Sequence, residues 1–436
     1  MAEDKKMEKL VSLCKRRGFV FPNSEIYGGL ANTYDYGPLG VELKNNIKQL
    51  WWRFFVQQRD DIVGIDGAIL SKAQVFAASG HIENFKDALV ECKKCHKRFR
   101  PDKLSDATRC PDCGGKFTKQ KMFSGMFKTI IGPIEEQGEV TYLRPETAQN
   151  IFVDYKNVLQ STNVKIPFGI AQMGKVFRNE ITTGNLIFRT LEFEQMEIEY
   201  FVNPKDDWNK KFEQWADCMH QFAKLVGLNL KKIHDVEVSE KDRAFYSQRT
   251  IDTEYEFPFG QDELWGLAYR GDYDLSNHQK HSGVDLTYFD AQNNERYLPH
   301  VIEPTFGVDR ILLAILSEAY VEETLESGET RVVLKLKPII APYKVAVFPL
   351  LANKEKLVEK AREICRELKK SYMVFCDDRG NIGKRYRYQD EIGTPFCVTI
   401  DFDTLEKGTV TVRDRDTMKQ DVVEVGKIEE YIAGRL

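Results

Sequence analysis

The sequence predicts an α+β protein with two folding units and a small metal-binding insertion. Three observations carry this prediction. Strand-like segments mix with amphipathic helices up to about residue 330, four cysteines cluster between residues 90 and 121, and strands alternate with helices from residue 343 to the end. A chain of 436 residues is also too long for a single hydrophobic core.

Composition limits the compartment and the partners. Hydrophobic residues make up 42% of the chain, and no apolar run approaches the roughly twenty residues that span a bilayer, so we expect no membrane partner. The charged N-terminal segment lacks the apolar stretch of a secretory signal, which predicts a cytoplasmic protein. Because 63 basic residues stand against 67 acidic ones, giving a net charge of −4, nucleic-acid binding would require a local basic patch.

The first long helix is predicted between Gly40 and Gln58. Apolar residues, several of them aromatic, recur there at helical spacing after the turn signal YGPLG. Such a wide aromatic face fits either packing against the core of the same chain or contact with a second subunit. The spacing is compatible with both arrangements.

Four cysteines in the insertion predict a metal site. Cys92 and Cys95 form one CxxC pair, and Cys110 and Cys113 form a second pair after fourteen intervening residues. Four thiolates that converge from two such turns suit tetrahedral Zn²⁺, and a site closed by four sulfurs would be structural rather than catalytic.

The other five cysteines stand singly in the sequence. We interpret them as small core residues, because a chain without an export signal favours reduced thiols over disulfides. They are Cys14, Cys218, Cys365, Cys376 and Cys397.

A charged strand pair is predicted between Val176 and Phe201. Alternate side chains of a strand share a face, so the returning strand would turn an apolar face to the core and a polar face to a binding site. The polar face comprises Phe193, Gln195, Glu197 and Glu199. Arg178 and Glu180, two residues apart, would also point the same way. The alternative is a solvated sheet face with compensating ion pairs.

A second polar cluster lies in the segment EPTFGVDR. Here an extended stretch passes through Gly307 into an apolar helix, and Glu303, Thr305 and Arg310 fall within eight residues. A guanidinium at this position can stack on a purine ring or pair with a phosphate. This second cluster favours a binding site over a solvated sheet face.

The C-terminal part is predicted to be a separate α/β domain. Residues Glu322 to Lys337 are polar and charged and are followed by Pro338 and Pro342, so a linker is predicted at residues 331–342, and residues 343–436 form the domain. Within it, GKRYRY interleaves basic and aromatic residues, a composition that suits RNA because cations meet phosphate while rings stack on bases. A solvated helix face is the alternative for any single residue of this segment.

The motifs resemble those of a known enzyme family. FRNE, from Phe177 to Glu180, resembles the second signature motif of class II aminoacyl-tRNA synthetases, and EPTFGVDR followed by an apolar helix resembles the third. With DYGPLG, LRPETAQ, EFEQMEIEY, YRGDYDLSNH and TIDFD…VRDRD, the chain resembles the homodimeric glycyl-tRNA synthetase family over nearly its whole length.

The resemblance implies a fold and domain limits. The catalytic domain of such an enzyme, here residues 1–89 and 122–330, is an antiparallel sheet flanked by helices. Residues 90–121 would be a zinc-binding insertion, residues 331–342 a linker, and residues 343–436 an α/β anticodon-binding domain.

The resemblance also implies an activity. Glycine, ATP and tRNA(Gly) would be the substrates of a homodimer that needs Mg²⁺ and structural Zn²⁺. Glycine would form glycyl-adenylate and would then be transferred to the 3'-terminal ribose. One alternative is a non-catalytic, dimeric class II relative that binds nucleic acid, and another is a class II enzyme for serine, threonine or proline. The two arginines and the carboxylate-rich motifs favour the glycine enzyme.

Site residues follow from the matching motif positions. Arg178 and Arg310 would be catalytic, with Arg178 on the α-phosphate and with Phe193 and Arg310 on either side of the adenine. The ATP-binding set is Arg178, Asn179, Glu180, Phe193, Glu263 and Arg310. The glycine-binding set is Arg144, Glu146, Glu197, Arg270, Glu303 and Thr305. Glu263 would hold Mg²⁺, with a surface carboxylate as the alternative.

Five positions depart from the family pattern. Thr305 stands where serine is usual, Leu191 where arginine is frequent, Lys72 where many class II enzymes have proline, and residues 183–184 replace a Pro-Arg pair. The Thr305 methyl group narrows a very small pocket, and the other changes put individual ATP, tRNA or subunit contacts in doubt.

Overall fold

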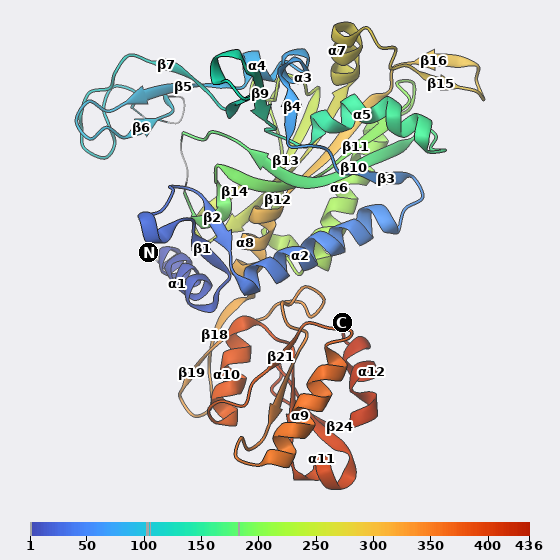
Figure 1. Ribbon diagram of the computed structural model, residues 1–436. Helices are drawn as coiled ribbons and strands as arrows, with labels where there is room; N and C mark the ends of the chain where they lie inside the picture. Colours follow the sequence, from blue (N-terminus) through green and yellow to red (C-terminus); the bar gives the residue numbers. More distant parts are fainter. Residues whose placement is uncertain (1, 102–103, 105, 182–183) are drawn as a thin grey trace.

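The computed structural model describes residues 2–101, 104, 106–181 and 184–436. Its largest element is a seven-stranded sheet in which every neighbouring pair is antiparallel except β10 and β3 (Figure 1). In spatial order the strands are β12 (Ile233–Glu237), β13 (Arg249–Phe257), β14 (Gly260–Gly271), β17 (His300–Gly307), β11 (Glu192–Val202), β10 (Phe168–Phe177) and β3 (Ile62–Ile65). This is the antiparallel sheet expected from the motifs.

One face of this sheet carries the main hydrophobic core. Met196, Ile198 and Tyr200 of β11 point into it, as the alternation along this strand predicts. In the N-terminal part, the helices that contribute to the same core are α1 (Ala2–Arg17), α2 (Pro38–Trp52), α6 (Trp208–Leu225) and α8 (Val308–Ala319).

Helix α2 packs its apolar side chains into this core. Its apolar side chains Leu43, Ile47 and Trp51 are fully buried, and the Trp51 ring meets Phe306 edge to face at 6.0 Å. The aromatic face of residues 40–58 is therefore used inside the chain, as the first of the two arrangements requires, and contact with a second subunit stays a prediction. The helix continues into a wider, π-type turn, Arg53–Gln57.

The opposite face of the sheet holds a smaller core and, beside it, a cavity. Tyr155 of α5 (Ala148–Ser161) packs on Phe201 of β11 and Phe168 of β10, with ring centroids 4.6 and 6.2 Å away. Helix α7 (Tyr273–Ser282) adds Leu275 to this cluster. A three-stranded sheet lies nearby in the fold, with β4 (Leu70–Lys72), β9 (Glu139–Leu143) and β8 (Lys128–Ile131) in that order.

The cysteine-rich insertion forms an arm that projects from this body (Figure 1). It follows α3 (Ala73–Ala78) and α4 (His81–Asn84) and contains β5 (Lys86–Glu91), β6 (Arg98–Phe99) and β7 (Lys121–Ser124), ordered β6-β5-β7. Its pairing therefore begins at Lys86 and ends at Ser124, a few residues outside the predicted limits 90–121.

Several short strand pairs and turns complete the N-terminal part. β1 (Val20–Pro22) pairs with β2 (Tyr34–Tyr36), β15 (Tyr288–Asp290) with β16 (Glu295–Tyr297), and β18 (Tyr320–Thr324) with β19 (Thr330–Leu334). Short 3-10 turns span Glu25–Tyr27, Glu135–Gln137, Leu186–Phe188 and Leu230–Lys232. Because β19 ends at Leu334, the predicted linker 331–342 begins inside a strand.

The C-terminal part is a five-stranded sheet with helices, in the order β21-β20-β22-β23-β24. Its strands are β20 (Val345–Pro349), β21 (Val374–Cys376), β22 (Phe396–Ile400), β23 (Thr409–Asp414) and β24 (Gln420–Glu424). Its helices are α9 (Glu355–Leu368), α10 (Ile382–Ile392), α11 (Phe402–Lys407) and α12 (Ile428–Ala433), and a 3-10 turn spans Val425–Lys427. A separate core of apolar residues fills the space between them.

A buried ionic centre joins the two parts. The Asp390 carboxylate of α10 accepts from Arg331 Nε of β19 at 2.8 Å and from Arg413 Nη1 of β23 at 2.9 Å. All three side chains are almost completely buried. A second junction pairs Glu391 with Arg17 of α1, whose guanidinium also lies 4.6 Å from the centre of the Tyr388 ring.

The GKRYRY segment lies in α10 and is largely used inside the chain. Buried Arg385 donates to the Pro349 carbonyl, the Tyr386 hydroxyl meets Thr399, and the Tyr388 ring faces Arg17. The rings that the composition suggested for base stacking are therefore engaged in packing, whereas Lys384 is exposed.

Two of the single cysteines are not independent core residues. Cys365 of α9 and Cys376 of β21 form a disulfide, because the helix packs directly on this strand. The prediction of reduced thiols is wrong for this pair, whereas Cys14 and Cys397 are buried as expected. Among the described residues, no helix combines the length and the apolar character that crossing a membrane requires.

Candidate active site

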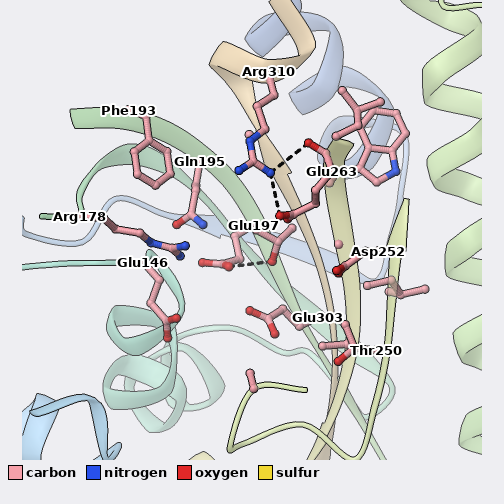
Figure 2. Close-up of a pocket in the computed structure, with 18 of the residues that line it drawn as sticks. Glu146, Arg178, Phe193, Gln195, Glu197, Thr250, Asp252, Glu263, Glu303 and Arg310 are labelled. Carbon is pink, nitrogen blue, oxygen red and sulfur yellow. Dashed lines mark hydrogen bonds and ion pairs between the residues drawn. The ribbon is translucent and has the colours of Figure 1, made fainter. Parts of the chain in front are cut away.

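A cavity of about 260 Å³ opens on the polar face of the seven-stranded sheet. Side chains from β11, β13, β14 and β17, from the start of α8 and from the loops that follow β10 and precede β13 line it. In Figure 2, Phe193 and Arg310 lie toward one end of the cavity, and Glu146, Glu197 and Glu303 lie toward the other. The predicted polar face of β11 thus borders the cavity, and residues distant in sequence meet there.

Arg310 is fixed at one end by a carboxylate and a carbonyl. It follows Gly307 in the first turn of α8, and its Nη1 lies 2.9 Å from Glu263 Oε2 and 3.1 Å from the Glu263 carbonyl oxygen. Its guanidinium also lies 4.6 Å from the centre of the Phe188 ring. Because the charge is held by contacts on one side, the guanidinium can present its plane to a ligand in the cavity.

Arg178 lies beyond the end of β10, in the loop that leads toward β11. Its Nε donates to the Pro145 carbonyl at 2.9 Å, and its guanidinium lies between the Phe85 and Phe193 rings, 5.6 and 5.5 Å from their centres. The strand ends at Phe177, so Arg178 and Glu180 share the cavity through a loop and not through strand alternation.

The base of the insertion supports this loop. The backbone N–H of Asn179 donates to the Gly125 carbonyl at 2.8 Å. Phe85, whose ring is one of the two beside Arg178, immediately precedes β5. Asn179 does not line the cavity; its side chain reaches the Ser124 carbonyl at 3.5 Å. The metal-binding arm and the loop that carries Arg178 are thus in direct contact.

Glu197 is held by two hydroxyl groups at the carboxylate-rich end. Thr147 Oγ1 donates to its Oε2 at 2.5 Å, and Thr305 Oγ1 donates to its Oε1 at 2.8 Å. Both donors fix the carboxylate without neutralising it, so Glu197 can still receive a cation. Thr305 therefore keeps the hydroxyl function expected of serine at this position.

Glu146 and Glu303 share this end of the cavity with a buried arginine. Burial raises the pKa of the Glu146 carboxyl, but the charges of His81 and Arg270 outweigh it and bring the pKa below its ordinary value. The Arg270 guanidinium lies 3.0 Å from Glu303 Oε1 and 3.7 Å from Glu146 Oε1, and it pairs with Asp274 at 2.7 Å. Arg270 is buried and does not line the cavity, so it contacts Glu146 and Glu303 on the side of these residues that faces away from the cavity.

Arg144 is not among the residues that line the cavity. Its buried guanidinium donates to the carbonyls of Gly67 and Lys175 at 2.7 and 2.8 Å. These carbonyls engage Nε and Nη1 of Arg144, which gives it a role in holding the backbone around the site. The glycine contact predicted for Arg144 stays a prediction.

Glu263 and Asp252 form a carboxylate pair on the wall of the cavity. Arg310 holds the pKa of Glu263 below its ordinary value, whereas burial and the nearby Glu263 charge raise the pKa of Asp252 to about 7. Two carboxylates that repel each other beside a binding cavity are a donor set that fits Mg²⁺, a cation that prefers oxygen ligands.

The four cysteines of the arm converge as their spacing predicts. The Sγ atoms of Cys92, Cys95, Cys110 and Cys113 all lie within 4.8 Å of one another. His96 is exposed and pairs with Glu91, which agrees with its exclusion from the ligand set. This arrangement can hold a metal ion.

Motif reasoning missed several residues around the cavity. Arg189, Asp252 and Tyr246 line it, and Arg189 lies two residues before Leu191, where the sequence departs from the family pattern. The centre of the Tyr246 ring lies 3.6 Å from the Arg270 guanidinium. His81 contacts Glu146 at 3.3 Å. Nothing local marks these residues, because the loops that carry them are brought to the site only by the tertiary fold. Thr183 of the departing pair lies outside the described residues.

Comparison with known proteins places the chain in a family. The family model described as the tRNA synthetase class II core domain (G, H, P, S and T) matches residues 127–319, and the anticodon binding domain model matches residues 344–435. The chain is 51% identical to the glycine–tRNA ligase of Thermobifida fusca over 461 aligned positions, covering 100% of this chain and 99% of that protein.

Two further relatives agree. The glycine–tRNA ligase of Clostridium beijerinckii is 50% identical, covering 100% of both chains, and that of Geobacillus thermodenitrificans is 50% identical, covering 98% of this chain and 97% of the relative. These matches confirm the resemblance and the fold class predicted from the motifs: the chain belongs to the glycine–tRNA ligase family of class II aminoacyl-tRNA synthetases.

Proposed function

We propose that the protein joins glycine to tRNA(Gly) in two steps, through glycyl-adenylate. The observation that carries this proposal is a single cavity with Arg310 toward one end, the glutamates Glu146, Glu197 and Glu303 toward the other, and the Arg178 guanidinium between them. An anionic nucleotide and the ammonium of an amino acid have opposite charges, and this separation suits binding them side by side.

In the first step a glycine carboxylate oxygen attacks the α-phosphorus of ATP. A new oxygen–phosphorus bond forms, the bond from the α-phosphorus to the bridging oxygen breaks, and pyrophosphate leaves with the electron pair. The protein supplies no covalent nucleophile. Arg178 stabilises the charge that develops on the α-phosphate oxygens, and Arg310 and Phe193 hold the adenine between them.

Mg²⁺ would be held by Glu263, with Asp252 close by, and it supplies charge neutralisation to the phosphates when bound. Arg310 meanwhile keeps Glu263 ionised and therefore able to act as a ligand. The wall of the cavity thus combines the fixed charge of Arg310 with the Glu263 and Asp252 carboxylates, to which Mg²⁺ could bind.

The amino-acid end recognises an ammonium group and excludes a side chain. Glu146, Glu197 and Glu303 offer acceptors to the glycine ammonium, and Thr147 and Thr305 fix the direction of Glu197. Glycine presents no side chain to grip, so alanine must be rejected by lack of room for its methyl group. The Thr305 methyl group adds to this restriction.

In the second step the terminal ribose hydroxyl of the tRNA attacks the carbonyl carbon of the adenylate, and AMP leaves. Residues 343–436 would bind the anticodon arm. We also propose a homodimer: Ile26 and Tyr27, at the tip of the loop between β1 and β2, are 87% and 88% exposed and are available to a second copy. The cytoplasmic location stays a prediction.

Glycine-dependent exchange between ATP and pyrophosphate tests the first step. We expect exchange with glycine and little with alanine or serine, because the pocket beside the three glutamates has no room for a side chain. Formation of glycyl-tRNA with the matching tRNA tests the second step. Lack of glycine-dependent exchange with folded, metal-loaded protein would contradict the proposal.

We propose that the four cysteines bind one Zn²⁺ that orders the arm. Cys95→Ser is expected to lose the bound zinc and to speed amide hydrogen exchange in residues 86–124, because a knuckle with three thiolates no longer closes. Zinc content by elemental analysis and hydrogen exchange measure the two effects.

Cys218→Ser, at a half-buried cysteine outside the cluster, is the control and should keep the zinc. Equal zinc content in the two variants would show that the cluster does not hold the ion.

A further inference from the structure

Glu199 lies beneath the carboxylate-rich end of the cavity and does not line it. It follows Glu197 by two residues on β11, so both side chains leave the same face of the sheet. Its side chain is 0% exposed, and within the described part of the chain neither carboxylate oxygen has a hydrogen-bond partner. A buried carboxyl group with two unpaired oxygens is uncommon and calls for an explanation.

Three carboxyl groups meet at this point. Glu197, Glu199 and Glu303 each place an oxygen within 4.8 Å of the others. The charged groups around Glu199 are Glu197 on its own strand, Glu303 on β17, Arg270 on β14 and Asp274 on α7.

The cation in this group is already engaged. Arg270 pairs with Asp274 at 2.7 Å and with Glu303 at 3.0 Å, and no ion pair joins it to Glu199 within the described residues. An ionised Glu199 would therefore be a buried negative charge beside other negative charges, an arrangement that proteins avoid by protonation.

We propose that Glu199 keeps its proton and, once its side chain closes the gap of at most 4.8 Å to a neighbouring glutamate, donates it in a hydrogen bond, and so acts as a positioning residue for the carboxylates that receive the glycine ammonium. The inference rests on the proposed function for the identity of that ammonium. The proton stays on Glu199 throughout the reaction, and no bond to it is made or broken.

A neutral Glu199 serves the site in two ways. It gives one of the clustered carboxylates a donor in a place that water does not reach, and it removes one negative charge from a group that Arg270 alone cannot balance. Burial, and then the charge of Glu303, raise the pKa of Glu199 well above its ordinary value, which agrees with this arrangement.

Two substitutions separate a proton-bearing role from a charged one. Glu199→Gln keeps the size and a donor but has no charge, so the KM for glycine should stay within about twofold of the native value. Glu199→Ala removes the donor, and we expect the KM for glycine to rise about tenfold with an unchanged KM for ATP. Glu192→Gln, at an exposed glutamate of the same strand, is the control and should change neither constant.

The dependence of stability on pH gives a readout that does not require activity. Because the folded chain holds a proton that an unfolded carboxyl group releases, Glu199 makes the native protein lose stability as the pH rises above the ordinary carboxyl pKa. Glu199→Gln lacks this loss, so its Tm should exceed the native Tm by more at about pH 8 than at about pH 5.

Infrared spectroscopy observes the proton itself. At neutral pH the native protein should show the C=O stretch of a protonated carboxyl group that is absent from Glu199→Gln. Absence of such a band from the native spectrum would overturn the proposal, and this result holds even if a variant does not fold.

Two other results would also overturn it. If Glu199→Gln raises the glycine KM as strongly as Glu199→Ala, Glu199 acts as a charged ligand, either of the ammonium or of a metal ion at the three glutamates. If the Tm difference between Glu199→Gln and the native protein does not vary with pH, no proton is held. A chain that failed to activate glycine would contradict the proposed function, and the Tm and infrared measurements would still decide the state of Glu199.

Discussion

Arg178→Ala is expected to lower glycine-dependent ATP–pyrophosphate exchange by about 10²–10³-fold, the usual cost of removing one fixed donor from a developing charge. The guanidinium is held in place by the Pro145 carbonyl and by the Phe85 and Phe193 rings, so its charge is already oriented before ATP arrives. The loss should fall on the rate of adenylate formation more than on glycine binding, because the glutamates and not Arg178 would hold the glycine ammonium. Pre-steady-state adenylate formation and exchange kinetics measure it.

The comparison variants keep this prediction specific. Arg178→Lys retains a charge but not the planar, two-pronged donor, and should recover part of the activity. Arg362→Ala, at an arginine of α9 that is 68% exposed, should leave exchange unchanged. Native-like exchange by a folded Arg178→Ala protein would show that the phosphate role belongs to another side chain.

Asp390→Ala is expected to have the largest effect on stability. It leaves Arg331 and Arg413 buried without the carboxylate that both contact, and breaking a buried ion pair in this way costs about 3–5 kcal/mol. Because Arg331 belongs to β19 and Arg413 to the C-terminal sheet, the loss should loosen the junction between the two parts of the chain. Urea unfolding and limited proteolysis of residues 331–342 measure both consequences.

An exposed aspartate provides the control for this change. Asp403 of α11 pairs with Lys407 in the same helix, and Asp403→Ala should change the free energy of unfolding by no more than about 0.5 kcal/mol. Asp390→Asn keeps the shape without the charge and should fall between the two. Equal unfolding midpoints for Asp390→Ala and the native chain would mean that the ionic centre adds nothing to the junction.

Local patterns predict those strands and helices whose own residues show a clear periodicity. The two faces of β11 follow from a period of two, and α2 and α8 follow from helical spacing and turn residues. Strand β24 carries no comparable pattern, because it lies at the edge of its sheet and is polar, with Val422 exposed to solvent.

Side-chain partners over long distances in sequence were not predictable in the same way. Motif position predicts glycine contacts for Arg144 and Arg270, but no local pattern reveals that carbonyl oxygens engage the first and that carboxylates engage the second behind the cavity lining. The bond between Cys365 and Cys376 depends on how α9 lies on β21, which the spacing of the two residues does not reveal. The unpaired state of Glu199 likewise becomes visible only when β17 and β14 are placed beside β11.

The contacts at the base of the cysteine-rich arm limit how this protein can be re-engineered. Phe85 and Gly125 belong to the arm by position but touch the loop of Arg178 and Asn179. A minimised version that trims everything between α4 and β8 would also remove these two supports, so a shortened chain should be rejoined outside them. Replacing the arm with that of a relative is compatible with the reaction centre provided that Phe85 and Gly125 are kept.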